Sequence, residues 1–318
     1  MSKESKYESY TKPSFVKKYG IEILIVFIGL VVIHAIFLSD AFKGDEIDPQ
    51  KASYFGDFVG GYIGSLFTLL SIILLYITIK EQRKTSAIEK FESKYFELIR
   101  MHRENASEFK LGESSGKKIF VLMIRELRLI LSRVTKMSNK HNLQLSKKEL
   151  LILSYRCLLY GVGPNSNTML KKNLKEYPNE FVDELIDLFY SKKERKKAIE
   201  ERKLKFNPFG GHQSRLGHYY RHLYQTVRYV DNQKIDIDKY EYVKTIRAQL
   251  TTHEQALLFV NSLTLTGKNW WTYDLIVKYR FVQNIPDGFF NDETEIVITD
   301  EFDKDYFEHQ EINTDNHN

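Results

Sequence analysis

The chain has 318 residues, a formal net charge of +5 and one cysteine, Cys157, which excludes an intrachain disulfide framework and suits a reducing cytosol. Cys157 lies in an apolar run, so we expect a buried structural thiol and not a nucleophile. Residues 287–318 contain eleven acidic residues and one lysine, a charge of −10 that leaves +15 on residues 1–285. We expect a disordered acidic tail over residues 286–318; alternatively, it folds back over a basic surface.

Two apolar stretches, residues 21–38 and 58–79, are each long enough to cross a bilayer, because a spanning helix needs about 20 mostly apolar residues. Lysines precede the first stretch and follow the second, whereas residues 39–57 between them contain five acidic and two basic residues. The positive-inside rule then predicts a transmembrane hairpin over residues 20–80, with both termini in the cytoplasm. A cleaved signal peptide is the weaker alternative, since the first apolar run is too long and no small-residue cleavage pattern follows it.

The second stretch also contains small residues at a spacing of four. Gly60 and Gly64 form one such pair, and Gly61 and Ser65 form another. Pairs of this kind let two helix backbones approach closely. They predict either a homo-oligomer or close packing of the two spans of one hairpin.

Helical periodicity dominates the rest of the chain. Apolar residues at steps of three and four over 88–102 predict that the second span continues as an amphipathic connecting helix within residues 81–110. Residues 112–116 interrupt the pattern, and loops are predicted at 161–164 and 207–211. Only residues 295–298 suggest a strand. Further helices are predicted over 119–134, 147–159, 181–201, 216–231, 240–250 and 252–265.

The predicted fold class is therefore all-α: a two-helix transmembrane hairpin followed by an α-helical cytosolic domain over residues 111–285. A short cytoplasmic segment, residues 1–19, precedes the hairpin. We expect no strand of the kind that builds a sheet in the cytosolic domain, since sustained alternation of period two is missing there.

Several blocks spread over residues 50–265 occur together in one order: Tyr54–Gly61, Thr78–Lys80 with Gln82, Lys90–Ile99, Gly217–Tyr224 and Arg247–Asn261. In this order they resemble the AbiC-like family of bacterial phage abortive infection proteins. The resemblance implies a role in defence against bacteriophage but no established reaction. With the predicted hairpin, it leads us to expect a protein of the bacterial inner membrane with a phage-derived trigger. The chain departs from the family pattern at the aromatic pair Tyr219 and Tyr220 and at Thr251.

Two Arg-His spacings resemble those of the all-α HEPN ribonucleases, in which four to six residues separate an Arg from the His that follows it. Arg215 and His222 have six residues between them, and Arg247 and His253 have five. An imidazole can move protons near neutral pH, and a guanidinium can stabilise the charge of a five-coordinate phosphate. These four residues are the candidate catalytic residues of a metal-independent endoribonuclease.

A structural interpretation of the same residues stands beside the catalytic one. Thr251-x-x-Glu254 is a capping box, which would leave His253 exposed in the first turn of a helix and Arg247 paired with a carboxylate. Arg215 shares a helix face with His222 only if that helix begins before Gly217.

We expect neither a metal nor a cofactor. His218-x-x-x-His222 has a zinc-binding spacing, but it lacks the Glu that follows the first His in zincins and has no clear third ligand. Gly161-Val-Gly163 is followed by Pro164, so it predicts a turn and not a phosphate-binding loop.

A basic run between residues 192 and 203 predicts attraction to a polyanion, either RNA or the anionic lipid of the inner leaflet. A solvated helix end is the structural alternative. The run consists of Lys192, Lys193, Arg195, Lys196, Lys197, Arg202 and Lys203.

Together these features predict a membrane-anchored effector toxin of antiphage defence with a helical cytosolic domain, and a HEPN-like ribonuclease is one mechanism that they leave open. Two alternatives remain. In one, the chain has no enzymatic activity and perturbs the membrane directly. In the other, it is a sensor or scaffold that recruits a separate toxin.

Overall fold

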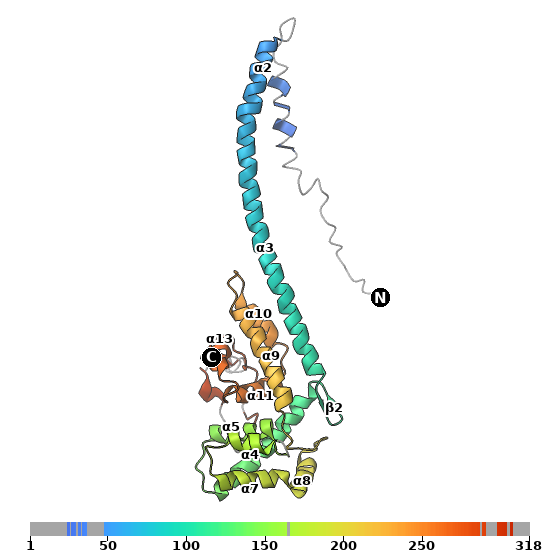
Figure 1. Cartoon of the computed structure of the whole chain (residues 1–318), viewed down its shortest axis with the longest axis vertical. Coiled ribbons are helices and arrows are strands. Elements are labelled where there is room, and N and C mark those ends of the chain that lie inside the picture. Colours follow the sequence, from blue (N-terminus) through green and yellow to red (C-terminus); the bar gives the residue numbers. More distant parts are fainter. Residues whose placement is uncertain are drawn as a thin grey trace, which may run out of the picture. The chain divides into compact units, whose positions relative to one another are not determined.

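A computed structural model describes residues 24–25, 27–29, 31–32, 34–36, 48–163, 166–286, 288–290, 298–303 and 306–307. The chain divides into two units, Met1–Lys84 and Thr85–Asn318. The described residues are mostly helical, in agreement with the predicted all-α class (Figure 1). The predicted segment 1–19 and most of the predicted tail lie outside the described residues.

In the first unit, one continuous helical segment, Pro49–Ser107, is long and apolar enough to cross a membrane, and it continues beyond this unit. It consists of α2 (Pro49–Asp57), the π-helix η1 (Phe58–Ile63) and α3 (Gly64–Ser107). The Asp48 carboxylate caps α2 by accepting from the amides of Gln50 and Lys51. None of the side chains in its apolar window is buried. The predicted second span, residues 58–79, thus lies within a helix that continues without a break, as the periodicity over 88–102 predicts.

The predicted first span is described only in part. Its described residues between positions 24 and 36 are helical, and the apolar helix Phe27–Ile36 is shorter than a full span. The other residues of the 21–38 prediction lie outside the description. Only one helix of spanning length is present in the described part of the chain, so the hairpin stays a prediction.

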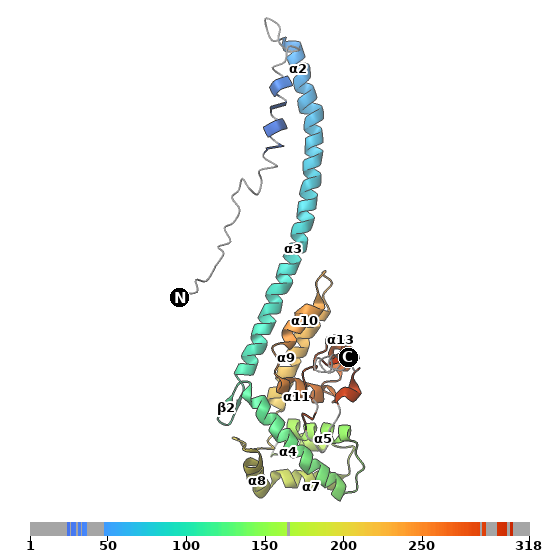
Figure 2. The ribbon, with the colours of Figure 1, turned by 180° about the vertical axis from the view of Figure 1, so that it is seen from behind.

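The second unit is a helical assembly around α4 (Lys118–Lys140). Helix α4 contacts α5 (Lys147–Tyr160), α7 (Asn179–Tyr190), α8 (Lys192–Arg202) and α11 (Thr252–Ser262) (Figures 1 and 2). Helix α9 (Gln213–Asp231) packs on α5 and on α10 (Lys239–Arg247). The remaining elements are α6 (Asn167–Asn173), α12 (Asn269–Thr272), α13 (Leu275–Lys278), the 3-10 helix η2 (Ile298–Glu301) and a β-hairpin of β1 (Lys110–Leu111) and β2 (Ser114–Ser115).

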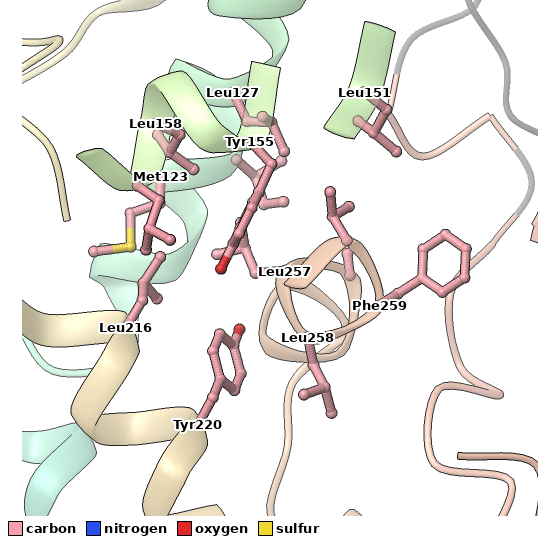
Figure 3. Packing of buried hydrophobic residues seen from close by; sticks show 14 of the residues in the cluster. Met123, Leu127, Leu151, Tyr155, Leu158, Leu216, Tyr220, Leu257, Leu258 and Phe259 are labelled. Carbon is pink, nitrogen blue, oxygen red and sulfur yellow. The ribbon is translucent and has the colours of Figure 1, made fainter. Parts of the chain in front are cut away.

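The main core lies where α4, α5, α9 and α11 meet. Figure 3 shows Met123, Leu158, Leu216 and Leu257 packed together, with the hydroxyls of Tyr155 and Tyr220 pointing toward one another. Cys157 is buried beside this core, and burial raises the pKa of its thiol to about 12. Its predicted role as a structural thiol is confirmed.

The predicted helices match the structure except at their ends and at one break, Ser191. Residues 181–201 form two helices, because Ser191 is extended and its hydroxyl accepts from the amide of Glu194, which restarts the helix as α8. The break at 112–116 is the β-hairpin turn, where a Cβ on Gly112 would lie 2.2 Å from the carbonyl oxygen of Lys205. Helix α6 was not expected. Ile298 begins η2 and not a strand, and residues 295–297 lie outside the described residues.

Candidate functional site

Helix α9 carries both residues of one predicted catalytic pair, Arg215 and His222. The helix begins at Gln213, so the condition that it starts before Gly217 is met. Just before it, the His212 ring lies 2.7 Å from the buried carboxylate of Glu126, which also accepts from the amide of Phe209. These contacts fix the start of α9. Seven residues apart, Arg215 and His222 lie on one flank of the helix, about 10 Å apart along its axis.

Arg215 and His222 nevertheless contact different elements. The Arg215 Nε donates to the carbonyl oxygen of Lys110 in β1, at 3.1 Å. The His222 ring stacks on His102 of α3, with ring centroids 5.8 Å apart and an interplanar angle of 11°. Among the described residues, no hydrogen bond joins either imidazole to a partner, and all four ring nitrogens are buried.

Burial favours the neutral form of both imidazoles. It lowers the pKa of His102 to about 3, with smaller contributions from His222 and Lys117. Burial also lowers the pKa of His222, and nearby His218 adds to the effect. His222 is half-buried as a residue, although both of its ring nitrogens are covered, and its catalytic role stays a prediction.

The second predicted pair, Arg247 and His253, lies on either side of the break between α10 and α11. Arg247 is buried, and its Nη1 donates to the carbonyl oxygens of Tyr279 and Arg280 at 3.0 and 3.1 Å. The carboxylate partner that the sequence predicts for Arg247 stays a prediction. His253 is half-buried and not exposed, with its ring edge-on to Phe289 at 5.2 Å. Its pKa is lowered by burial first and then by Arg128 and Arg125.

The capping box at the start of α11 is confirmed. The Glu254 carboxylate accepts from the Thr251 amide at 2.6 Å, and the Thr251 hydroxyl accepts from the Glu254 amide at 3.3 Å. The fully buried carboxylate also accepts from the Tyr219 hydroxyl at 2.5 Å and from Lys117 Nζ at 3.2 Å. Burial, as the larger cause, and the Glu254 carboxylate, as the next, raise the pKa of the Tyr219 hydroxyl well above its usual value. Glu254 therefore joins α9, α11 and the start of α4. The sequence predicted only its capping of α11.

A second surface of α9 faces an open pocket of about 740 Å³. His218 and Arg221 lie on it as exposed neighbours three residues apart. His218 and His222 thus face different surroundings, and the described residues contain no group of three or more metal-ligating side chains. The other lining residues are Leu159, Gln213, Ser214, Leu216, Gly217, Tyr220, Tyr224, Gln225, Asn261, Thr266, Gly267, Asn269 and Trp270.

Sequence reasoning missed this pocket. The spacing of His218, Arg221 and Gln225 would have indicated one polar stripe. What it could not indicate is the opposite wall, which comes from residues 266–270.

The basic run lies mostly on α8. Some charged side chains of this helix contact the rest of the protein, whereas others are exposed. Its acidic residues Glu194, half-buried, and Glu201, exposed, bind Arg133 of α4 at 2.7 and 2.6 Å. Arg195 also points inward, since its Nε donates to the carbonyl oxygen of Phe189 at 2.9 Å. Arg202 is half-buried. The exposed members of the predicted polyanion site are Lys192, Lys193, Lys196, Lys197 and Lys203.

Lys203 also lines a basic groove that the sequence did not predict. The groove has a volume of about 650 Å³ and lies between the β-hairpin, the start of α4 and the segment after α8. Its cationic members are Lys117, Lys118, Arg125, Lys203 and Lys205.

Residues 211–290 match a family model described as Putative phage abortive infection protein. This region includes α9, α10, α11, α12 and α13 and all but one of the residues that line the 740 Å³ pocket. Neither a curated protein nor a solved structure matches the chain. The resemblance predicted from the sequence blocks is confirmed, and the match supports a general role in abortive infection.

Proposed function

Because residues 211–290 match the phage abortive infection family, we propose that this chain is a membrane-anchored effector of antiphage defence. In this proposal the helical unit senses a phage-derived trigger and acts on the bilayer through α3. The proposed mechanism involves no enzymatic reaction, in contrast to the ribonuclease hypothesis.

The observation that carries the proposal is the change of surroundings along α3, a single helix of 44 residues. Between Gly64 and Ile79 its large apolar side chains are exposed, whereas Phe91, Tyr95, His102 and Ala106 are buried. Residues 58–79 extend about 33 Å as a helix, close to the thickness of a bilayer's hydrocarbon core. This length supports a membrane anchor that continues into the folded unit without a linker.

Hydroxyl groups in the apolar part are compatible with lipid. Thr68, Ser71 and Thr78 each donate to the carbonyl oxygen four residues earlier, at 2.8 Å. Ser65 does the same to Gly61. Bonds of this kind satisfy polar groups within the helix, as a hydrocarbon environment requires.

The buried part of α3 contacts the region that matches the family. The Tyr95 hydroxyl donates to the carbonyl oxygen of Tyr242 in α10 at 2.8 Å, and the Tyr242 hydroxyl donates to Glu92 at 2.5 Å. The Phe91 ring stacks on Tyr229 of α9 at 5.5 Å. A rearrangement of α9 or α10 would therefore act directly on α3, which supports coupling between a bound trigger and the membrane.

Self-association in the membrane is part of the proposal. A Cβ added at Gly60 or Gly61 would meet no atom within 4 Å, so the described residues leave this helix surface open to a second helix. Cross-linking in native membranes tests this, and Gly60→Leu with Gly61→Leu should abolish the dimer band. An unchanged band would contradict association through this surface.

The deciding experiment follows membrane potential and total RNA integrity in cells that express the chain during phage challenge. The proposal expects early depolarisation with intact RNA. Early RNA cleavage with an intact potential would overturn it in favour of the ribonuclease, and alanine at Arg215, His222, Arg247 and His253 together should then abolish protection. Protection with neither change, and with dependence on a neighbouring gene, would overturn it in favour of a scaffold that recruits a separate toxin.

A further inference from the structure

The pocket beside α9 has the composition of a binding site for an anion. No aspartate or glutamate lies among its lining residues, whereas His218 and Arg221 line it together. Within the described part of the chain, neither of these two side chains makes a hydrogen bond or an ion pair, and both are exposed. A free guanidinium offers a planar fork of donors that matches phosphate.

Aromatic and carboxamide side chains complete the pocket. Tyr224 is half-buried, and its ring is held edge-on against Trp270 with centroids 5.7 Å apart. Gln225 and Asn269 are exposed carboxamides on the same lining. Aromatic faces stack on planar rings, and carboxamides both donate to and accept from the edges of such rings.

The wall opposite α9 is held in place by the core. Asn261 Nδ2 donates to the Thr266 hydroxyl at 3.3 Å and to the Tyr155 hydroxyl at 3.0 Å. A Cβ on Gly267 would lie 2.3 Å from the Asn261 carbonyl oxygen, so only glycine permits this approach. The buried Trp270 ring packs 5.0 Å from Phe281. Contacts within the chain thus hold this wall of the pocket, and the volume of about 740 Å³ suits a small molecule.

We propose that this pocket binds a small anion with a planar ring, of the nucleotide class. Arg221 and His218 hold the phosphate, the ring stacks on Tyr224, and Gln225 and Asn269 bind the ring edge. The inference concerns binding by the folded unit and stands independently of the membrane proposal.

The test is a titration of the purified full-length chain in detergent with AMP and GMP, followed by tryptophan fluorescence. The chain has two tryptophans, and Trp271→Phe leaves Trp270 beside the pocket as the only one. We expect a saturable change with at least one nucleotide, and at least ten-fold weaker binding of adenosine, guanosine and inorganic phosphate. The absence of a saturable change with both nucleotides, or equal affinity for nucleotide and nucleoside, would overturn the proposal.

Two substitutions locate the site. A Cβ on Gly217, which lines the pocket, would meet nothing within 4 Å, so Gly217→Phe fills the space without an initial clash. It should weaken nucleotide binding at least ten-fold, while the matched control Gly217→Ala retains it. Unchanged binding by a folded Gly217→Phe variant, as judged by circular dichroism, would overturn the assignment to this pocket.

Arg221→Ala provides the second, independent variant, because Arg221 is exposed and its loss should not affect folding. It should weaken nucleotide binding about ten-fold and leave nucleoside binding unchanged. Lys234→Ala, which removes an exposed cation in the segment after α9, is the control and should have no effect. Equal behaviour of the two variants would overturn the role given to Arg221.

Discussion

Helix α3 contains two segments that share a backbone conformation and differ in everything that surrounds it. From Gly64 to Ile79 apolar side chains occur on all sides of the helix, and residues such as Phe67 and Leu75 are about 60% exposed (63% and 59%). From Thr85 to Ser107 the apolar residues form a stripe, and Phe91 and Tyr95 are 3% and 1% exposed. An all-round apolar surface is typical of a helix that is covered by lipid or by other protein, whereas a stripe is typical of a helix that packs on one folded partner.

The polar groups of the two segments differ in the same way. Hydroxyls of the apolar segment bond to carbonyls of their own helix, as at Thr68 and Gly64. The Tyr95 hydroxyl of the packed segment bonds instead to α10. The hydroxyl groups of the apolar segment therefore have hydrogen-bond partners within their own helix, as a solvent without hydrogen-bonding groups requires. The packed segment depends instead on α9 and α10 for its stability.

Charges in the apolar segment should have the largest effect. Leu66→Arg with Leu70→Arg places two guanidiniums near the middle of the proposed span, at a cost of about 6 kcal/mol relative to leucine. We expect the chain to leave the carbonate-resistant membrane fraction, as measured by fractionation and immunoblot. The matched control, Met169→Arg with Leu265→Arg, changes two exposed apolar residues of the second unit and should leave the distribution unchanged. Retention of the first double variant in the membrane would contradict the anchor.

The packed segment offers a comparison between neighbours. Tyr95→Ala removes a buried ring that contacts Phe91 and Tyr242, and we expect it to lower the free energy of unfolding by about 3 kcal/mol. Phe96→Ala removes a ring that is 58% exposed and should change stability by less than about 0.5 kcal/mol. Urea unfolding of the full chain in detergent measures both. Equal effects would contradict the packing of this segment.

A smaller effect should appear as pH dependence at His102. Its pKa is about 3 in the folded chain and about 6.5 when unfolded, so the unfolded state binds the proton first. The stabilisation by neutral His102 is complete above pH 6.5 and is lost as the pH falls toward 3, at up to about 1.4 kcal/mol per pH unit. His222 and Lys117 face the ring and oppose its charge, and the Tyr219 ring lies 4.5 Å away.

The measurement compares the midpoint of thermal unfolding between pH 7 and pH 5 in the parent chain and in His102→Leu. We expect a shallower pH dependence in the variant, with the share that His222 contributes still present. Phe96→Ala should keep the slope of the parent chain. An equal slope in His102→Leu would show that His102 titrates in the folded state.

Whether a structural feature could be predicted from the sequence depended on how far apart along the chain its contacting residues lie. Helices α4, α5 and α9 followed from their own apolar stripes, and the Thr251 and Glu254 capping box followed from two residues three apart. The burial of Arg247 could not be predicted in this way, because two of its acceptors, the carbonyl oxygens of Tyr279 and Arg280, lie more than 30 residues away in the sequence. The contact between His102 and His222 likewise joins helices far apart in sequence.

The pocket beside α9 was unpredictable for the same reason. Its cationic face is visible in the spacing of His218 and Arg221, but its other wall includes Gly267, which packs closely on the Asn261 carbonyl oxygen. The prediction of a continuous helix across Ser191 was wrong for a local reason. The residues around it favour helix, so the prediction over 181–201 ran through it, although Ser191-x-x-Glu194 has the spacing of a capping box and could have indicated the restart.

The smallest effect on the fold should come from the cationic surface of α8, which contrasts with both segments of α3 because it is exposed and polar. Lys192, Lys193, Lys196 and Lys197 are exposed, and within the described residues they make no ion pair. Their simultaneous change to Gln should leave thermal stability unchanged, since surface substitutions of this kind are worth a few tenths of a kcal/mol.

Binding of single-stranded RNA to the full chain in detergent would then show whether this surface acts on a polyanion. If all four lysines neutralise phosphates, the slope of log affinity against log salt concentration should fall by about 2.8, because each phosphate contact contributes about 0.7. Arg195→Gln is the contrasting variant: its guanidinium donates to the carbonyl oxygens of Phe189 and Val162, so it should reduce stability more than the salt slope. An unchanged slope in the quadruple variant would mean that these lysines are only a solvated helix surface.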